Sequence, residues 1–341
     1  MAISTVVVGF GLAGRVFHAP LIDADPDYSL DAIVTSSDER VAAASARYPG
    51  ARVVPDLDAL LRDGRVPDLA VVATPNDSHV ALARRLLEGG VDVVVDKPLA
   101  PRSAEAAALV VHARELGRRL TVFQNRRWDG DFRTVRDLVA GGELGEVLQF
   151  ESAFGWWSPT IGASWRDRLP LADGGGVLFD LGPHLIDQAI ALFGPVESIH
   201  AELDQRRAGA VNDDDSFVAL THRSGVRSRL WMSVVLPEQR PRFRVTGRRA
   251  VATSWGLDPQ EPQLADGVVP DDPAYGIHGE HPTIAVVSPD TVRHVPKAAG
   301  DYPAFYRELA AALRDGGPLP VDPTTSVEVI ELMERAIDAR A

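Results

Sequence analysis

The sequence predicts an α/β protein with two domains: a doubly wound parallel sheet over residues 1–124, then an α+β domain over 125–341 with a large, mostly antiparallel open sheet. Length is the first reason, because 341 residues exceed the roughly 100–200 that one domain usually holds. Second, short apolar runs alternate with helical patterns up to about residue 125. Third, β-branched and aromatic runs joined by short glycine-containing links follow this point.

Each apolar run in the first domain predicts a strand, and each amphipathic stretch between runs predicts a helix. The expected strands lie at 4–11, 30–36, 67–75, 91–98 and 119–125, and the expected helices at 12–24, 38–48, 78–90 and 103–117. Strands that are apolar on both flanks and separated by helices form parallel sheets covered on both faces. The first domain is therefore expected to be doubly wound.

The second domain has a different pattern, in which the apolar runs follow one another with few helices between them. Strands are expected at 146–157, 216–222, 226–236, 242–247 and 250–255. Helices are expected after the glycine run at 174–176, and in the segments 302–317 and 324–339. Residues 256–284 are rich in proline, glycine and aspartate, and are expected to form a long excursion on the surface.

Composition and charge exclude several classes of protein. The net charge of −13 argues against binding to nucleic acid or to anionic membranes. No apolar run approaches the roughly 18 residues of a membrane span, and the first residues lead into a strand without the basic region of a signal peptide. Cysteine is absent, which excludes thiolate chemistry, and no group of histidines and carboxylates has metal-site spacing. We expect a cytoplasmic protein without a metal ion.

A glycine-rich motif follows the first expected strand. It reads Gly9-Phe10-Gly11-Leu12-Ala13-Gly14, which is G-x-G-x-x-G between a strand and a helix. In this context the glycines allow a tight turn, close approach of the backbone to a pyrophosphate and close packing of helix on strand. The next helix directs free N–H groups at the phosphates. The motif predicts a Rossmann domain that binds a dinucleotide.

The end of the second strand indicates which dinucleotide binds. NAD-binding folds usually place an acidic residue about 20 residues after the glycines, to hold the ribose hydroxyls. Thr35-Ser36-Ser37 occupies that place here. These small side chains leave room for a 2′-phosphate, which Arg40 is close enough in sequence to contact, so NADP is favoured. The alternative is NAD, with Asp38 turned back to the ribose.

The end of the third strand supplies further candidates, because ligands of open α/β sheets bind beyond the carboxyl ends of the strands. Thr74, Pro75 and Asn76 lie there and are expected to line the cofactor. His79 follows closely. It is expected either to contact the cofactor or to lie on the surface, in the first turn of a helix that Ser78 caps.

The fourth strand delivers Asp96 and Lys97 to the same edge of the sheet. Pro98 favours an extended conformation at Lys97 and stiffens the exit from the strand. Lys97 is therefore expected beside the nicotinamide of a bound dinucleotide, with Asp96 next to it in the cofactor site. The alternative is a surface lysine paired with Asp96.

A second polar group of residues lies in the segment "FDLGPHLIDQ", where Asp180 and His184 are four residues apart. On a helix this spacing puts both side chains on one face, and Pro183 is tolerated in the first turn. A histidine oriented by a carboxylate is a common general base near neutral pH. With Lys97, the pair suits oxidation of an alcohol: His184 takes the proton, Lys97 stabilises the alkoxide and Asp180 orients them. Without Lys97, a capping aspartate and a core histidine would be the simpler interpretation.

These motifs resemble those of the glucose–fructose oxidoreductase / inositol dehydrogenase / rhizopine catabolism (Gfo/Idh/MocA) dehydrogenases over essentially the whole chain. That family has a Rossmann domain and a second domain whose open sheet often forms the oligomer interface. Its Glu-Lys-Pro motif reads Asp96-Lys97-Pro98 here, and its D-x-x-x-H motif matches Asp180 and His184, which implies their catalytic roles. "GFGLAGRVFHAPLI" and "QNRRWDGDF" are similar to the NADP-dependent scyllo-inositol dehydrogenase branch, which tends to carry an arginine where Ser37 stands.

Further pocket candidates follow the fifth strand or precede the catalytic helix: Asn125, Arg127, Trp128, Trp165 and Arg166. Asn125 and Arg166 are expected beside the cofactor, and the other three beside the substrate, which Arg166 is also placed to reach. The alternatives are a packing cluster at a domain hinge and a solvated arginine. Trp156 and Trp157 are assigned to sheet packing or a pocket wall, and the aspartates at 213–215 to a solvated turn.

Taken together, the residues predict an NADP-dependent oxidoreductase that acts on a secondary alcohol of a neutral cyclic polyol or sugar, with an inositol/inosose pair as first choice. The enzyme alternatives are an aldose or a sugar intermediate of natural-product biosynthesis. An alternative of another class is a non-catalytic sensor that binds the cofactor. The presence of Lys97, Asp180 and His184 together argues against a sensor. The resemblance implies a homodimer or homotetramer formed through the C-terminal sheet.

Overall fold

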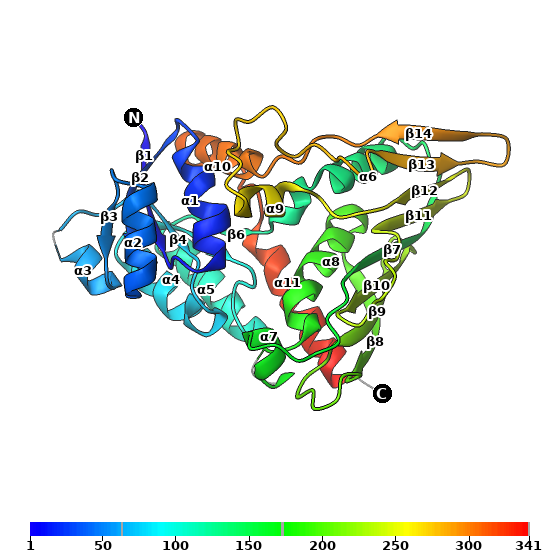
Figure 1. The fold of residues 1–341 in the computed structure, drawn as a ribbon, viewed down its shortest axis with the longest axis horizontal. Helices are drawn as coiled ribbons and strands as arrows, with labels where there is room; N and C mark the ends of the chain where they lie inside the picture. The colour runs from blue at the N-terminus through cyan, green and yellow to red at the C-terminus, as the bar shows by residue number, and fades with distance from the viewer. Residues whose placement is uncertain (63, 172–173, 340–341) are drawn as a thin grey trace. The chain divides into compact units, whose positions relative to one another are not determined.

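The computed structural model describes residues 1–62, 64–171 and 174–339, which form two compact units (Figure 1). The units do not divide the chain into two consecutive blocks. The first unit contains Met1–Asn125, Gln260–Tyr275 and Asp301–Val327, and the second contains Arg126–Pro259, Gly276–Gly300 and Glu328–Ala341. Two segments late in the chain therefore complete the first unit.

The first unit is built on a six-stranded parallel sheet with the strand order β3-β2-β1-β4-β5-β6. Its strands are β1 (Ile3–Val8), β2 (Tyr28–Val34), β3 (Arg52–Val54), β4 (Leu69–Val72), β5 (Asp92–Asp96) and β6 (Leu120–Phe123). This is the Rossmann order, so the predicted doubly wound sheet is confirmed. The five expected strands are present, and β3 is a sixth, whose three residues are too few to give a sequence pattern.

Most helices of the first unit alternate with its strands, and two come from the late segments of the chain. They are η1 (Ala13–His18), α1 (Ala19–Asp23), α2 (Asp38–Arg47), α3 (Leu57–Leu61), η2 (Asn76–Ser78), α4 (His79–Glu88), α5 (Ser103–Glu115), α9 (Gln260–Ala265) and α10 (Pro303–Asp315). The expected helix at 12–24 begins as one π-helical stretch, η1, before it continues as α1. The stretch 256–284, expected on the surface, contains α9, whose Gln260 and Leu264 are buried. That expectation was wrong for this helix.

The second unit is built on an eight-stranded sheet with the order β14-β13-β12-β11-β7-β10-β9-β8. Its strands are β7 (Val147–Gly155), β8 (Val196–Asp204), β9 (Asp215–His222), β10 (Arg227–Ser233), β11 (Phe243–Gly247), β12 (Val251–Ser254), β13 (Thr283–Val287) and β14 (Val292–Pro296). Among these strands, β7 and β10 pair in parallel and the other neighbours are antiparallel. The predicted mostly antiparallel open sheet is confirmed.

One helix, α8 (Val177–Phe193), lies along a face of this sheet and contacts β7, β9 and β10 (Figure 1). The other helices that contribute to this unit are η3 (Asn125–Trp128), α6 (Gly130–Ala140), α7 (Trp165–Arg168) and α11 (Pro323–Asp338). Residues of β9 alternate between buried and half-buried, as expected for a sheet covered by helices on one face. Along the described stretches, no helix combines the length and the apolar character of a membrane span.

Candidate active site

The glycine-rich loop between β1 and η1 has the shape that a pyrophosphate needs. Gly9 has φ of +103°, and a Cβ there would lie 2.5 Å from the carbonyl oxygen of Ala73. A Cβ on Gly14 would lie 2.0 Å from the carbonyl oxygen of Gly9, so helix and strand pack closely there. A Cβ on Gly11 would meet no atom within 4 Å, which leaves the backbone open to a ligand. These three environments fit the roles of the glycines in a dinucleotide cradle.

Between these glycines, the other residues of the motif have separate surroundings. Phe10 is buried and packs edge-on against Tyr48, with their ring centroids 6.2 Å apart. Leu12 is exposed, and Ala13 begins η1. Phe10 therefore anchors the loop in the core of the first unit, while Gly11 and Leu12 remain accessible to a ligand.

The end of β2 lies next to the first turn of α2. Thr35 is buried and donates its backbone N–H to the carbonyl oxygen of Val54. Ser37 is the N-cap residue of α2, while Ser36 and Arg40 are exposed. The hydroxyl of Ser36 and the guanidinium of Arg40 are thus accessible to a ligand, as is the carboxylate of Asp38.

The loop after β4 is held by a buried histidine. His79 is fully buried, with Nδ1 2.8 Å from the carbonyl oxygen of Pro98 and Nε2 2.8 Å from that of Thr74. The Thr74 hydroxyl lies 2.7 Å from the Ser78 hydroxyl, which donates to the carbonyl oxygen of Pro75. His79 is therefore not a surface residue, and its ring connects the loop after β4 to the turn after β5.

Asn76 begins the short helix η2 and is half-buried. Asp96 and Lys97 end β5 and follow it, at the carboxyl edge of the sheet. The Asp96 carboxylate lies 3.6 Å from Nε2 of His18. Burial opposes ionisation of Asp96, but the nearby His18 ring and then the charge of Lys97 and the neighbouring His79 hold the pKa of this carboxyl below its usual range. Asp96 is an anion beside Lys97 at neutral pH.

In the second unit, the start of α8 depends on the run of glycines before it. A Cβ on Gly175 would lie 1.9 Å from the carbonyl oxygen of Leu169, and one on Gly176 would lie 1.8 Å from Oδ1 of Asp213. Gly176 also has φ of +93°, which a residue with a side chain rarely adopts. Only glycine lets the chain pass this close to Asp213 and enter the helix.

Asp213 caps the N-terminus of α8. Its Oδ2 accepts from the backbone N–H of Leu178 at 2.8 Å and from the Ser216 hydroxyl at 2.6 Å. Its neighbour Asp214 is fully buried and accepts from Arg207 Nε at 3.0 Å. The interpretation of 213–215 as a solvated turn was wrong, because helix capping and ion pairing hold the first two carboxylates inside the unit.

Helix α8 carries Asp180 in its first turn and His184 one turn later. His184 is buried, whereas Asp180 is half-buried, and its Oδ2 lies 3.0 Å from Nη1 of Arg166. The guanidinium of Arg166 stacks over the Trp156 ring at 4.8 Å. Trp156, Arg166 and Asp180 thus form a connected polar and aromatic group at the start of α8. Trp165, next to Arg166, is 43% exposed.

Arg127 forms a bidentate pair with Asp187, which lies one turn after His184 on α8. Its Nε and Nη2 each donate to a different carboxylate oxygen at 2.7 Å. Its neighbours Trp128 and Asn125 are buried. Asn125 ends the first segment of the first unit, to which Lys97 also belongs, whereas Asp180 and His184 belong to the second unit.

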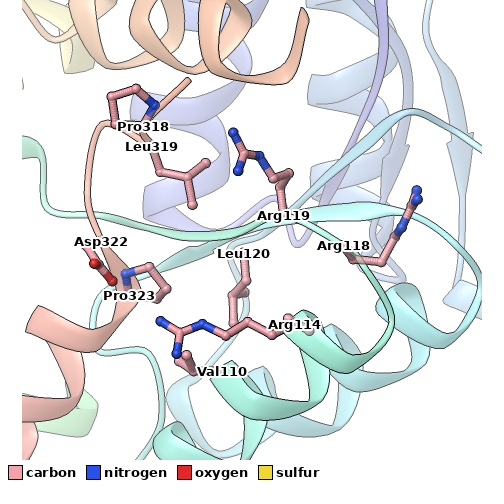
Figure 2. A pocket seen from close by; sticks show the side chains of 10 residues that line it. Val110, Arg114, Arg118, Arg119, Leu120, Pro318, Leu319, Asp322 and Pro323 are labelled. Atoms are coloured by element: carbon pink, nitrogen blue, oxygen red, sulfur yellow. The ribbon is translucent and has the colours of Figure 1, made fainter. Parts of the chain in front are cut away.

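A cavity of about 290 Å³ lies elsewhere in the first unit, between α5 and the segment 318–323 (Figure 2). Arg114, Arg118 and Arg119 line it, but Figure 2 shows their guanidinium groups pointing in different directions. Arg119 donates to the carbonyl oxygen of Ala312, and Arg118 to that of Gly90. The cavity adjoins the start of β6, at the edge of the sheet away from the glycine loop, so it is not the cofactor site.

Comparison with known proteins agrees with this arrangement. A family model described as "Oxidoreductase family, NAD-binding Rossmann fold" matches residues 3–124, and one described as "Oxidoreductase family, C-terminal alpha/beta domain" matches residues 136–341. The chain belongs to the Gfo/Idh/MocA oxidoreductase family. It is an enzyme with a domain that binds a nicotinamide dinucleotide, in a family whose dehydrogenases act on CH–OH groups.

Several relatives match nearly the whole chain. The uncharacterized oxidoreductase YdgJ of Escherichia coli is 38% identical over 98% of this chain and 95% of its own. The scyllo-inositol 2-dehydrogenase (NADP(+)) IolW of Bacillus subtilis is 31% identical over 98% and 92%. The solved structure of the putative oxidoreductase yvaA from Bacillus subtilis has a TM-score of 0.92 and 29% identity, over 99% of this chain and 96% of that one.

Proposed function

We propose that this Gfo/Idh/MocA oxidoreductase is an NADP-dependent dehydrogenase that interconverts a secondary alcohol and a ketone on a neutral cyclic polyol or sugar, with an inositol/inosose pair as first choice. The observation that carries the proposal is the position of three functional side chains, one after a strand of the first unit and two near the start of a helix of the second. Lys97 follows β5 at the same edge of the sheet as the glycine cradle, and Asp180 and His184 lie one turn apart on α8.

The catalytic roles follow from the chemistry of these three side chains. In the oxidation direction His184 takes the hydroxyl proton of the substrate, and the Lys97 ammonium stabilises the alkoxide as it forms. Asp180, paired with Arg166, holds a negative charge at the margin of α8 and orients the substrate hydroxyls. When bound, the nicotinamide accepts or supplies the hydride.

The proposed preference for NADP rests on the end of β2. Ser36 and Arg40 are exposed there, so a hydroxyl and a guanidinium are available to a 2′-phosphate. Thr35 and Ser37 complete a stretch without a carboxylate. The name of the relative IolW, a scyllo-inositol 2-dehydrogenase of NADP(+), supports the same choice. Asp38 is the ribose ligand of the competing proposal, in which NAD binds.

The proposed neutral substrate rests on the pairing of the arginines. Arg166 is paired with Asp180, and Arg127 with the buried Asp187, so each arginine already has a carboxylate partner. The exposed Trp165 ring offers an aromatic surface for the apolar face of a cyclic polyol. The names of two partial matches, an inositol 2-dehydrogenase of Leifsonia xyli and a D-apiose dehydrogenase of Paraburkholderia graminis, support a polyol or a sugar.

The test compares kcat/KM for scyllo-inositol, myo-inositol, glucose and a sugar phosphate, each with NADP and with NAD. Turnover is measured by the absorbance of the reduced nicotinamide. The expected result is turnover of an inositol with NADP. A preference of more than about tenfold for the sugar phosphate, about 1.4 kcal/mol of transition-state binding, would refute the neutral substrate. Failure of every polyol and sugar would refute the proposed function.

The proposed oligomer, a homodimer or homotetramer, forms through the face of the eight-stranded sheet that α8 does not cover. Phe217 and Trp231 are register partners on β9 and β10, and their half-buried rings lie 5.3 Å apart. Arg240 stacks over the Trp231 ring. A Trp231→Glu variant is expected to shift the mass measured by light scattering towards the monomer, and an unchanged mass would argue against this face.

A further inference from the structure

Three residues of the first unit form a buried polar network: Tyr306, His18 and Asp96. The Tyr306 hydroxyl lies 2.7 Å from Nδ1 of His18, and Nε2 of the same ring lies 3.6 Å from Oδ1 of Asp96. His18 and Tyr306 are both fully buried. They are 288 residues apart in the sequence, because Tyr306 belongs to α10 and His18 ends η1.

The direction of the hydrogen bond between Tyr306 and His18 follows from the tyrosine. Burial, and then the charges of Tyr28 and Asp96, raise the pKa of Tyr306 well above its usual range, so the hydroxyl keeps its proton. That hydroxyl donates to Nδ1, which leaves the ring proton on Nε2, the atom that faces the Asp96 carboxylate. This placement of the proton supports the anionic form of Asp96.

Tyr306 is itself held rigidly. Its carbonyl oxygen accepts from the Tyr28 hydroxyl at 2.6 Å. Its ring contacts those of Phe305 and Phe123, with centroids 5.3 and 6.1 Å apart. Phe123 is in turn the register partner of Asp96 across β5 and β6. Tyr306, which orients His18, therefore packs against the residue of β6 that lies opposite Asp96 of β5.

The network bears on Lys97 through the chain, because Lys97 directly follows Asp96, the last residue of β5. Holding the Asp96 side chain against His18 therefore fixes the end of the strand from which Lys97 leaves. On the other side of Lys97, the carbonyl oxygen of Pro98 is held by Nδ1 of His79 at 2.8 Å. Lys97 thus lies between two residues that buried histidines hold in place.

We propose that Tyr306, His18 and Asp96 are positioning residues for the reaction, which place the Lys97 ammonium through Asp96. The proposal rests on the proposed function, in which Lys97 stabilises the alkoxide. It gives the late segment that contains α10 a role in catalysis, which it exerts through His18, Asp96 and Lys97.

The first experiment measures the protonation of the His18 ring and needs no substrate. Nitrogen-15 NMR of the histidine rings at neutral pH, with the His18 signal assigned by its loss in a His18→Gln variant, is expected to show a proton on Nε2. A ring without a proton on Nε2 would overturn the network, because nothing would then join the ring to Asp96.

The second experiment separates positioning from structural support. Tyr306→Phe and His18→Leu are expected to lower kcat about tenfold or more, because a displacement of about 1 Å at a catalytic group has effects of this size or larger. The dissociation constant of the reduced cofactor, measured by its fluorescence, is expected to change by less than about twofold. Tyr275→Phe is the control, since it removes a buried tyrosine hydroxyl of the same unit outside the network.

His18→Gln provides the rescue, because a glutamine amide can accept from Tyr306 and donate to Asp96. It is expected to recover most of the kcat lost in His18→Leu. An unchanged kcat in Tyr306→Phe, or cofactor affinity that falls in proportion to kcat, would overturn the positioning role. Lack of turnover in the unmodified protein would refute the proposed function instead, and the ring-proton measurement still decides the network.

Discussion

Asp213, which caps the helix that carries His184, gives a prediction about stability and pH. Its side chain is only 2% exposed, and burial raises its pKa from the usual 3.8 to about 6. When the pKa of a carboxyl is higher in the folded protein than in the unfolded chain, the group stabilises the fold fully at pH values below its pKa in the unfolded chain. That contribution is lost as the pH rises through about 6. We predict that Asp213→Asn removes this dependence.

The magnitude follows from the two pKa values. Their difference corresponds to about 3 kcal/mol, at about 1.4 kcal/mol for each tenfold change in proton affinity. Most of this change in the free energy of unfolding occurs between pH 4 and pH 7. The free energy of unfolding of Asp213→Asn, relative to the unmodified protein, should therefore rise by about 2 to 3 kcal/mol across this range. The buried amide adds a constant cost of about 1–3 kcal/mol, so only the change with pH is diagnostic.

The assay is urea unfolding followed by tryptophan fluorescence at several pH values between 4 and 7. All six tryptophans lie in the second unit, so the signal reports the unfolding of the unit that contains α8. Asp215→Asn is the matched control. This neighbouring carboxylate is 37% exposed and pairs with Arg206 on the surface, so its replacement should give a difference that changes little with pH.

A difference between Asp213→Asn and the unmodified protein that stays flat from pH 4 to pH 7 would contradict the prediction. So would a difference that falls as the pH rises, because that slope is the one expected of a carboxylate stabilised in its ionised form. Either result would mean that Asp213 caps α8 as an ordinary anion.

Three further predictions concern turnover, the cofactor and a buried charge. Lys97→Met and His184→Ala should each lower kcat about a hundredfold or more, with cofactor affinity retained in His184→Ala; near-normal turnover at neutral pH would contradict the assigned roles. Arg40→Ala should narrow the ratio of NADP to NAD dissociation constants measured by titration, and a preference for NAD in the unmodified protein would contradict the phosphate contact. Arg127→Ala should lower the free energy of unfolding of the second unit, measured by tryptophan fluorescence, by about 3 kcal/mol or more, because Asp187 then stays buried without its partner. A loss below about 1 kcal/mol would argue against the bidentate pair.

The sequence by itself determined the sheet of the first unit and the glycine cradle. Both depend on neighbouring residues: β-branched runs specify buried strands, and the steric requirements at Gly9 and Gly14 arise within the loop and the strand beside it. The spacing of Asp180 and His184 likewise placed them one turn apart on a helix, because helical periodicity is a local property.

Only the tertiary structure decided which partner each polar side chain has. Asp213 belongs to a run of three aspartates that looks solvated in sequence, yet it closes the N-terminus of α8, whose first residues come more than thirty positions earlier. His18 meets Tyr306 across 288 residues, and Arg127 meets Asp187 across 60. The physical reason is that burial and pairing of charges depend on which surfaces the chain brings together. That choice is made by the packing of whole elements, which leaves no periodic signal around a single aspartate or histidine.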